Sequence, residues 1–189
     1  MRVIIISGGQ SGADRGALLA ARDIGVDYAG WVPRGGRCED GEHLLEAFPN
    51  LRETPSRDYP QRTRLNVEES DVTIVVTSNG RIETPGSRLT VEHCARVRRP
   101  FRVVAPSGLG ECLTVLLRNW NGETLRINMA GTRESKSPGI QDAVRRETVA
   151  VLMKAARDGL VECRCPLPSG AGQGRGRPSV GESEQLSLF

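Results

Sequence analysis

The sequence predicts one α/β domain built on a mostly parallel β-sheet with helices on both faces. Up to about Gly159, apolar strand-like segments alternate with helix-like segments, an order that produces parallel sheets. The segment 72–76 (VTIVV) shows no polar alternation, which is typical of a central strand buried on both faces. The 189 residues are enough for one such domain with a sizeable core.

The elements follow one another regularly along the chain. The first strand runs into a glycine-rich segment and then into a helix that Gly25 ends. The last helix places Ile140, Val144 and Val151 at helical spacing and ends at Gly159. The expected strands cover residues 3–7, 28–32, 72–77, 101–105 and 125–129, and the expected helices cover residues 14–24, 59–70, 88–98, 111–120 and 140–157. This alternation predicts a Rossmann-like fold.

The composition changes near Pro166. Residues 168–179 are rich in Gly, Ser, Pro and Arg and lack a core-forming apolar pattern, which predicts a flexible linker. We therefore expect a ligand-binding domain at residues 1–160, a linker at 161–184 and a terminal peptide motif at 185–189.

Charge and cysteine content set limits on function. The net charge is +3, and the 26 basic residues are 24 Arg and two Lys, so the charge balance does not indicate nucleic-acid binding. The five cysteines have no zinc-site spacing, so we expect no metal site, reduced thiols and a cytoplasmic location. No apolar run reaches membrane-spanning length, so we expect no membrane association. We expect a homo-oligomer.

The glycine-rich segment between the first strand and the first helix is the strongest candidate for a ligand site. The unpaired N–H groups of a helix start attract phosphate, and glycines let a ligand approach the backbone. An ordinary tight turn between strand and helix is the alternative. The candidate ligand-binding residues here are Gly8, Gly9, Gln10, Ser11, Gly12, Asp14 and Arg15.

Three further polar loops follow predicted strands and should meet the first at one edge of the sheet. The second combines arginines with an acidic pair, and the third resembles an anion nest at a helix start. A solvated charged loop and a plain N-cap by Ser87 are the respective alternatives. The candidates are Arg34, Glu39 and Asp40 in the second loop, Gly86, Ser87 and Thr90 in the third, and Arg133, Glu134, Ser135 and Lys136 in the fourth.

These loops also resemble those of the putative molybdenum carrier family, within a Rossmann-like group that includes DprA and the Lonely Guy phosphoribohydrolases. The resemblance implies a carrier or sensor of a phosphorylated ligand, with molybdenum cofactor as the named candidate and a nucleotide as the other. It covers about residues 1–157. The matching segments are residues 7–17, 30–35, 39–41, 51–55, Tyr59, 61–63, 66–67 and 130–140.

One departure bears on catalysis. Lonely Guy enzymes carry a Pro-Gly-Gly-x-Gly-Thr-x-x-Glu pattern whose Glu helps to cleave an N-glycosidic bond. The matching stretch, residues 85–93, has Ser87 and Leu89 for two glycines and His93 for the Glu. This favours binding over catalysis. The alternative is a nucleotide N-glycosidase that uses Glu92 as catalytic residue, with Asp14 or Glu39 in support.

The two histidines, His43 and His93, are expected on the surface or in loops rather than in a catalytic set.

The terminal pentapeptide resembles a different motif. Gln185, Leu186, Ser187, Leu188 and Phe189 match the Gln-Leu-Ser/Asp-Leu-Phe pattern by which bacterial replication and repair proteins bind the DNA polymerase sliding clamp. The resemblance implies a partner-binding peptide on a flexible tether. A tail that folds back onto the domain is the alternative.

Overall fold

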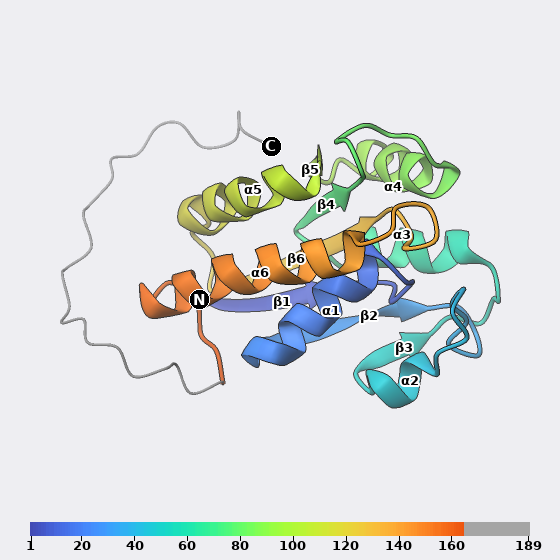
Figure 1. Ribbon diagram of the computed structural model, residues 1–189, viewed down its shortest axis with the longest axis horizontal. Coiled ribbons are helices and arrows are strands. Elements are labelled where there is room, and N and C mark those ends of the chain that lie inside the picture. The colour runs from blue at the N-terminus through green and yellow to red at the C-terminus, as the bar shows by residue number, and fades with distance from the viewer. Residues whose placement is uncertain (165–189) are drawn as a thin grey trace.

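The computed structural model describes residues 1–164 as an α/β fold around a six-stranded parallel sheet (Figure 1). The strand order is β3-β2-β1-β6-β4-β5. The strands are β1 (Arg2–Ile6), β2 (Asp27–Val32), β3 (Leu51–Glu53), β4 (Val72–Val76), β5 (Phe101–Val104) and β6 (Thr124–Gly131). The helices are α1 (Ala13–Ile24), α2 (Leu44–Ala47), α3 (Tyr59–Glu68), α4 (Pro85–Arg96), α5 (Pro106–Asn119) and α6 (Ile140–Arg157). The predicted Rossmann-like class is confirmed.

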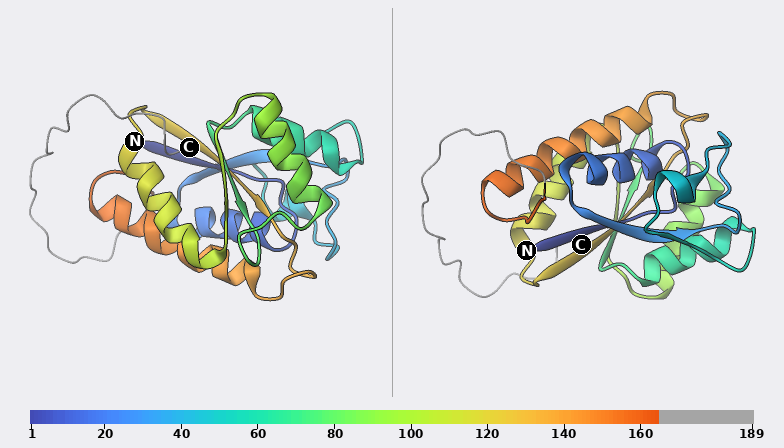
Figure 2. Two further views of the ribbon diagram at one scale, coloured as in Figure 1. Left: turned by 90° about the horizontal axis from the view of Figure 1, so that it is seen from above. Right: turned by 90° about the horizontal axis from the view of Figure 1, so that it is seen from below.

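Helices cover both faces of the sheet. Helices α1, α5 and α6 pack together on one face, and α3 and α4 pack together on the other (Figure 2). The main core lies under the first group and includes Ile5, Ile74, Leu113, Ile127 and Leu152, all buried. These aliphatic side chains come from β1, β4 and β6 and from the helices above them, so burial of apolar surface joins the sheet to this layer.

Strand β6 lies in the middle of the sheet although it is the last strand in the sequence. It pairs with β1 on one side and with β4 on the other. From β1 the chain continues outward to β2 and β3, whereas β4 and β5 lie on the opposite side of β6. The strand order therefore reverses next to β6, and ligands of open parallel sheets bind at the carboxyl ends of strands at such a point.

Two short elements were not predicted from the sequence, namely β3 and α2. Helix α2 has four residues and β3 has three, so neither is long enough for alternating or helical spacing of apolar residues to repeat. The spacing of apolar residues in the sequence therefore cannot reveal them. A small second core holds them in place. It consists of Leu18, Val32, Leu44, Phe48 and Leu51.

Helices α4 and α5 begin earlier than predicted, each at a proline. Pro85 and Pro106 occupy first-turn positions, where the missing N–H has no intrahelical partner in any case. Helix α5 therefore also includes Gly108 and Gly110.

The end of the described chain contacts the domain. Val161 is buried, the Glu162 N–H donates to the Met1 carbonyl, and Arg164 pairs with Asp27 at 2.8 Å. The remainder of the predicted linker and the terminal motif lie outside the described residues. Within residues 1–164, the four cysteines are free thiols, and no helix has both the length and the apolar character to span a bilayer.

Candidate functional site

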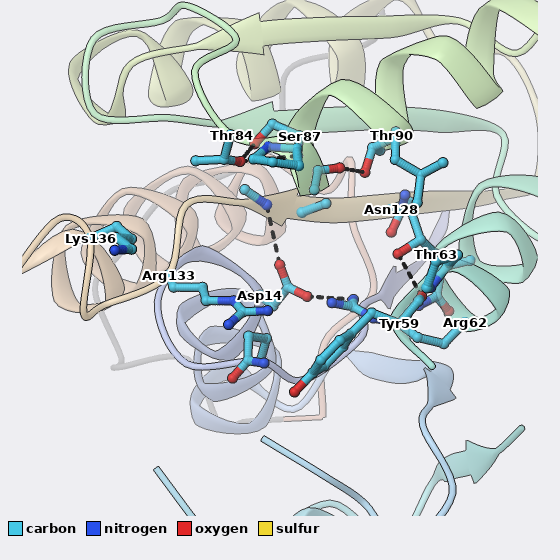
Figure 3. A pocket seen from close by; sticks show the side chains of 18 residues that line it. Asp14, Tyr59, Arg62, Thr63, Thr84, Ser87, Thr90, Asn128, Arg133 and Lys136 are labelled. Carbon is cyan, nitrogen blue, oxygen red and sulfur yellow. Dashed lines mark hydrogen bonds and ion pairs between the residues drawn. The ribbon is translucent and has the colours of Figure 1, made fainter. Parts of the chain in front are cut away.

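A cleft of about 480 Å³ opens at the carboxyl ends of the central strands (Figure 3). Helix α3 and the first turns of α4 form its walls, and the end of β6 contributes to its floor. Figure 3 shows Thr84 and Ser87 on one side and Asp14, Tyr59 and Arg133 on the other. The lining residues are Gln10, Asp14, Tyr59, Pro60, Arg62, Thr63, Asn66, Thr84, Pro85, Gly86, Ser87, Leu89, Thr90, Asn128, Ala130, Gly131, Arg133 and Lys136.

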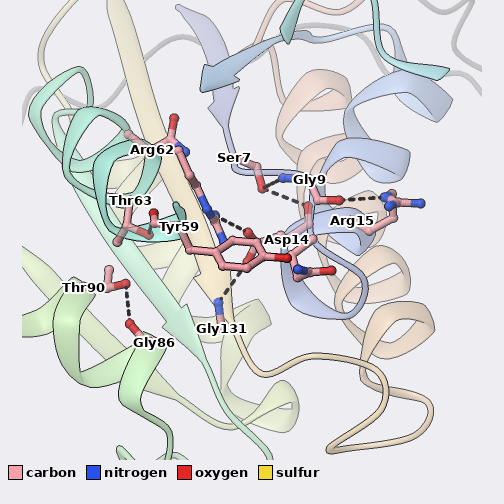
Figure 4. Close-up of polar contacts among 12 residues, drawn as sticks. Ser7, Gly9, Asp14, Arg15, Tyr59, Arg62, Thr63, Gly86, Thr90 and Gly131 are labelled. Atoms are coloured by element: carbon pink, nitrogen blue, oxygen red, sulfur yellow. Dashed lines mark hydrogen bonds and ion pairs between the residues drawn. The ribbon is translucent and has the colours of Figure 1, made fainter. Parts of the chain in front are cut away.

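Asp14 joins three segments of the chain inside this cleft. The residue is 4% exposed; Oδ2 pairs with Nη1 of Arg62 at 2.8 Å, and Oδ1 accepts the Gly131 N–H at 3.2 Å (Figure 4). A Cβ at Gly8 would overlap the Arg62 guanidinium, so the glycine makes room for this cation. The ion pair fixes α3 against the start of α1 and the end of β6.

The start of α1 is closed by protein groups. The Gly12 N–H donates to Oε1 of Gln141 at 3.2 Å, and the Ala13 N–H donates to the Thr132 carbonyl at 3.1 Å. Gly12 has φ +93°, and a Cβ there would overlap the Thr132 carbonyl oxygen. These two donors are used inside the protein and are not free to bind a phosphate. Of the loop residues, Gln10 and Asp14 line the cleft, whereas Gly8, Gly9, Ser11, Gly12 and Arg15 do not.

Arg15 points away from the cleft (Figure 4). Its guanidinium pairs with Glu42, lies 3.6 Å from Asp40, and donates through Nε to the Gly9 carbonyl at 3.0 Å. Arg15 and Asp40 thus hold the loop after β2 in place. Arg34 is exposed and also lies outside the cleft.

Glu39 connects three of the four predicted loops. Its carboxylate accepts hydrogen bonds from the Ser11 hydroxyl and from the Ser135 hydroxyl (2.8 Å) and N–H (3.3 Å), and Arg133 lies 3.7 Å away. Burial by itself raises the pKa of the Glu39 carboxyl. The hydrogen bonds from Ser11 and Ser135 and the charge of Arg133 outweigh burial, so the pKa lies below its ordinary value.

Glu39→Gln is expected to lower the free energy of unfolding at neutral pH by about 1 kcal/mol, because charged hydrogen bonds are lost. A folded-state pKa below the unfolded value stabilises the protein above the ordinary pKa of 4.5, and this contribution is lost as the pH falls through the folded-state value. Urea unfolding at stepwise lower pH should therefore show the two proteins converging in acid. Glu92→Gln is the control, since Glu92 is exposed on α4. A constant difference at all pH values would contradict this interpretation.

The start of α4 is open toward the cleft, in contrast to that of α1. Thr84 caps the helix by accepting the Ser87 N–H at 3.2 Å, and Pro85 carries no N–H. Apart from the adjacent residues and the backbone of its own helix, no atom lies within 4 Å of a Cβ built at Gly86, so this first turn faces free space. The Thr90 hydroxyl donates to the Gly86 carbonyl at 3.0 Å. The positive end of the α4 dipole is therefore accessible to an anion.

Across the cleft, two guanidinium groups lie near an aromatic ring. The Cζ of Arg133 is 5.0 Å from the ring centroid of Tyr59, and that of Arg62 is 5.8 Å away. Lys136 also lines the cleft, and its ammonium has no ion-pair partner within residues 1–164. Asn66 fixes this wall, because its side chain accepts from the Trp31 N–H at 2.7 Å and donates to the Trp31 carbonyl at 3.1 Å.

Reasoning from the sequence did not predict that residues of α3 line the cleft. That reasoning considered loops that follow strands, and Tyr59, Arg62, Thr63 and Asn66 lie on a helix. These positions lie in the segments that resemble the putative molybdenum carrier family, and that resemblance could have pointed to them.

Three further predicted site residues, Glu92, Glu134 and Ser135, lie outside the cleft. Glu134 caps α6, since its two oxygens accept the Gly139 and Gln141 N–H groups at 2.5 and 2.9 Å. Ser135 binds Glu39 and does not line the cleft, and Glu92 lies outside the cleft as well. Within residues 1–164, no three His, Cys, Asp or Glu side chains are grouped so that they could hold a metal ion.

The expectation for His93 was wrong. His93 is 3% exposed within α4; Nε2 lies 2.8 Å from Glu68 of α3, and Nδ1 lies 2.7 Å from Arg96. Its side chain joins α3 to α4, the two helices that form the cleft walls. His43 is exposed next to α2, as expected.

Known proteins resemble the chain over most of this domain. The model of the circularly permutated YpsA SLOG family matches residues 5–152. A crystal structure described as a putative molybdenum carrier protein from Syntrophus aciditrophicus SB is 33% identical, with a TM-score of 0.68. That alignment covers 79% of this chain and 94% of the other. No curated protein matches the chain.

Proposed function

Because the chain belongs to the circularly permutated YpsA SLOG family, we propose that it binds a phosphorylated small molecule in this cleft as a carrier or sensor. The ligand is a nucleotide or a pterin related to molybdenum cofactor. The description of the Syntrophus protein as a molybdenum carrier supports the pterin as a candidate.

One observation supports this proposal above the others: an aromatic ring and an open helix start face the same cleft. Tyr59 provides a plane for stacking a heterocycle, and the adjacent guanidinium groups of Arg62 and Arg133 add positive charge. The first turn of α4 and the Lys136 ammonium provide positive potential for a phosphate. Stacking and phosphate binding together select a phosphorylated ring compound.

The cleft favours binding over glycosidic cleavage. Among residues 1–164, Asp14 is the one carboxylate that lines it, and both Asp14 oxygens are held by Arg62 and Gly131. Glu92, the candidate for an N-glycosidase, is exposed outside the cleft. Release of free base from nucleoside monophosphates, abolished by Glu92→Gln, would support the enzyme instead.

Lys136→Gln is expected to weaken binding of a nucleoside or pterin monophosphate roughly two- to fivefold, because one solvent-exposed charge contact is lost. Binding of the same compound without its phosphate should not change. Isothermal calorimetry on ligands found by thermal shift, molybdenum cofactor included, measures both. Lys154→Gln is the matched control, since Lys154 lies in the last turn of α6. If no phosphorylated ring compound stabilises the wild-type protein, the proposed function is wrong.

We also propose that residues 185–189 bind the bacterial sliding clamp and so hold the cleft domain near replicating or repaired DNA in the cytoplasm. The match of all five residues to the clamp-binding pattern supports this role. These residues lie outside those that the structure describes.

A further inference from the structure

One buried polar side chain in the cleft has an unsatisfied donor. Gln10 is 3% exposed and lines the cleft, and its Nε2 has no hydrogen-bond partner within residues 1–164. Buried polar groups are almost always paired, so a lone buried amide donor indicates an acceptor supplied from outside the chain.

The orientation of this amide is fixed by its oxygen. Oε1 of Gln10 accepts two backbone N–H groups, from Ser11 at 3.1 Å and from Glu39 at 2.9 Å. A flipped amide would place its NH₂ group against these two donors, so Nε2 is the amide atom left without a partner. Arg62, which also lines the cleft, has a second unpaired buried donor at Nε.

From these donors we propose that the cleft selects ring compounds that present a carbonyl oxygen, namely phosphorylated 6-oxopurines or 4-oxopterins, over their amino analogues. This inference rests on the proposed function. The ring stacks on Tyr59, its phosphate lies at the start of α4, and its carbonyl oxygen accepts from Nε2 of Gln10. An exocyclic amino group at the same place is a hydrogen-bond donor, as Nε2 of Gln10 is, so neither group would find an acceptor.

Three purine nucleotides that differ at position 6 test the proposal. Inosine monophosphate carries the oxo group, purine riboside monophosphate carries hydrogen and adenosine monophosphate carries the amino group. Calorimetry on the full chain should give at least about tenfold tighter binding of the oxo than of the amino compound, with the hydrogen compound between them. The 4-oxo and 4-amino forms of a pterin monophosphate should rank in the same direction.

Gln10→Glu provides a variant that keeps the acceptor and removes the donor. Its carboxylate can still accept the Ser11 and Glu39 N–H groups, so we expect the oxo preference to be lost or reversed. Gln61→Glu is the matched control. Oε1 of Gln61 also accepts a backbone N–H, from Ser56 at 3.1 Å, but Gln61 does not line the cleft. This variant should keep the oxo preference.

Equal affinity of the wild-type protein for the oxo and amino compounds overturns the inference, as does an oxo preference that survives in Gln10→Glu. Either result leaves the proposed function intact, because phosphorylated rings would still bind. The absence of binding by all of these compounds refutes the proposed function and the inference together. Should Gln10→Glu not fold, the ranking of ligands by the wild-type protein still decides.

Discussion

Gly12→Ala is expected to lower the free energy of unfolding by about 3 kcal/mol or more. The backbone at Gly12 has φ +93° and ψ −134°, a region that side chains with a Cβ hardly enter. The added Cβ would also overlap the Thr132 carbonyl oxygen, which the Ala13 N–H binds. The loop between β6 and α6 would have to move, together with its contacts to Glu39.

Gly86→Ala is the matched control for this change. Its position in the first turn of α4 has ordinary helical backbone, and nothing beyond the adjacent residues and the backbone of its own helix lies within 4 Å of the added Cβ. The stability of this variant should stay within about 0.5 kcal/mol of wild type. Urea unfolding of both variants measures the difference. A Gly12→Ala protein of normal stability that fails to bind ligand would show that the loop serves the ligand directly.

Deletion of Leu188 and Phe189 is expected to abolish binding to the bacterial sliding clamp. In a short peptide most of the binding free energy comes from a few apolar anchors, and each is worth about 2 kcal/mol or more, roughly thirtyfold in affinity. Loss of two anchors leaves Gln185 and Leu186, which cannot offset the entropy lost on ordering the peptide. The fold and the cleft should be unaffected, because the deleted residues follow the domain in the chain.

Fluorescence anisotropy with a labelled peptide of residues 181–189 measures clamp binding, and the full chain with and without the deletion is then compared by competition. Ser187→Ala is the control variant, since Ser or Asp occupies this position in the pattern. It should bind within about twofold of the unchanged peptide. If the peptide does not bind while a known clamp peptide binds in the same assay, the tether is refuted.

The sequence by itself determined the fold class and the edge of the sheet at which the cleft lies. The apolar segment 72–76 has a composition typical of burial on both faces, and it forms β4, an interior strand that pairs with β5 and β6 and is buried along its length. The spacing of Ile140, Val144 and Val151 was enough to place α6 over residues 140–157, because the apolar face spans several turns. Gln10, Asp14, Gly86, Ser87, Thr90, Arg133 and Lys136 were predicted at loops of this edge and line the cleft.

Only the tertiary structure decided which donors remain available to a ligand. Two glycine-containing helix starts looked alike in sequence, but Gln141 and Thr132 close the start of α1, whereas the start of α4 faces open space. Tyr59 and Arg62 reach the cleft because α3 packs beside α4, and no local pattern reports such a contact between helices. Local propensity depends on neighbours in the chain, whereas the availability of a donor depends on groups distant in the chain that fold against it.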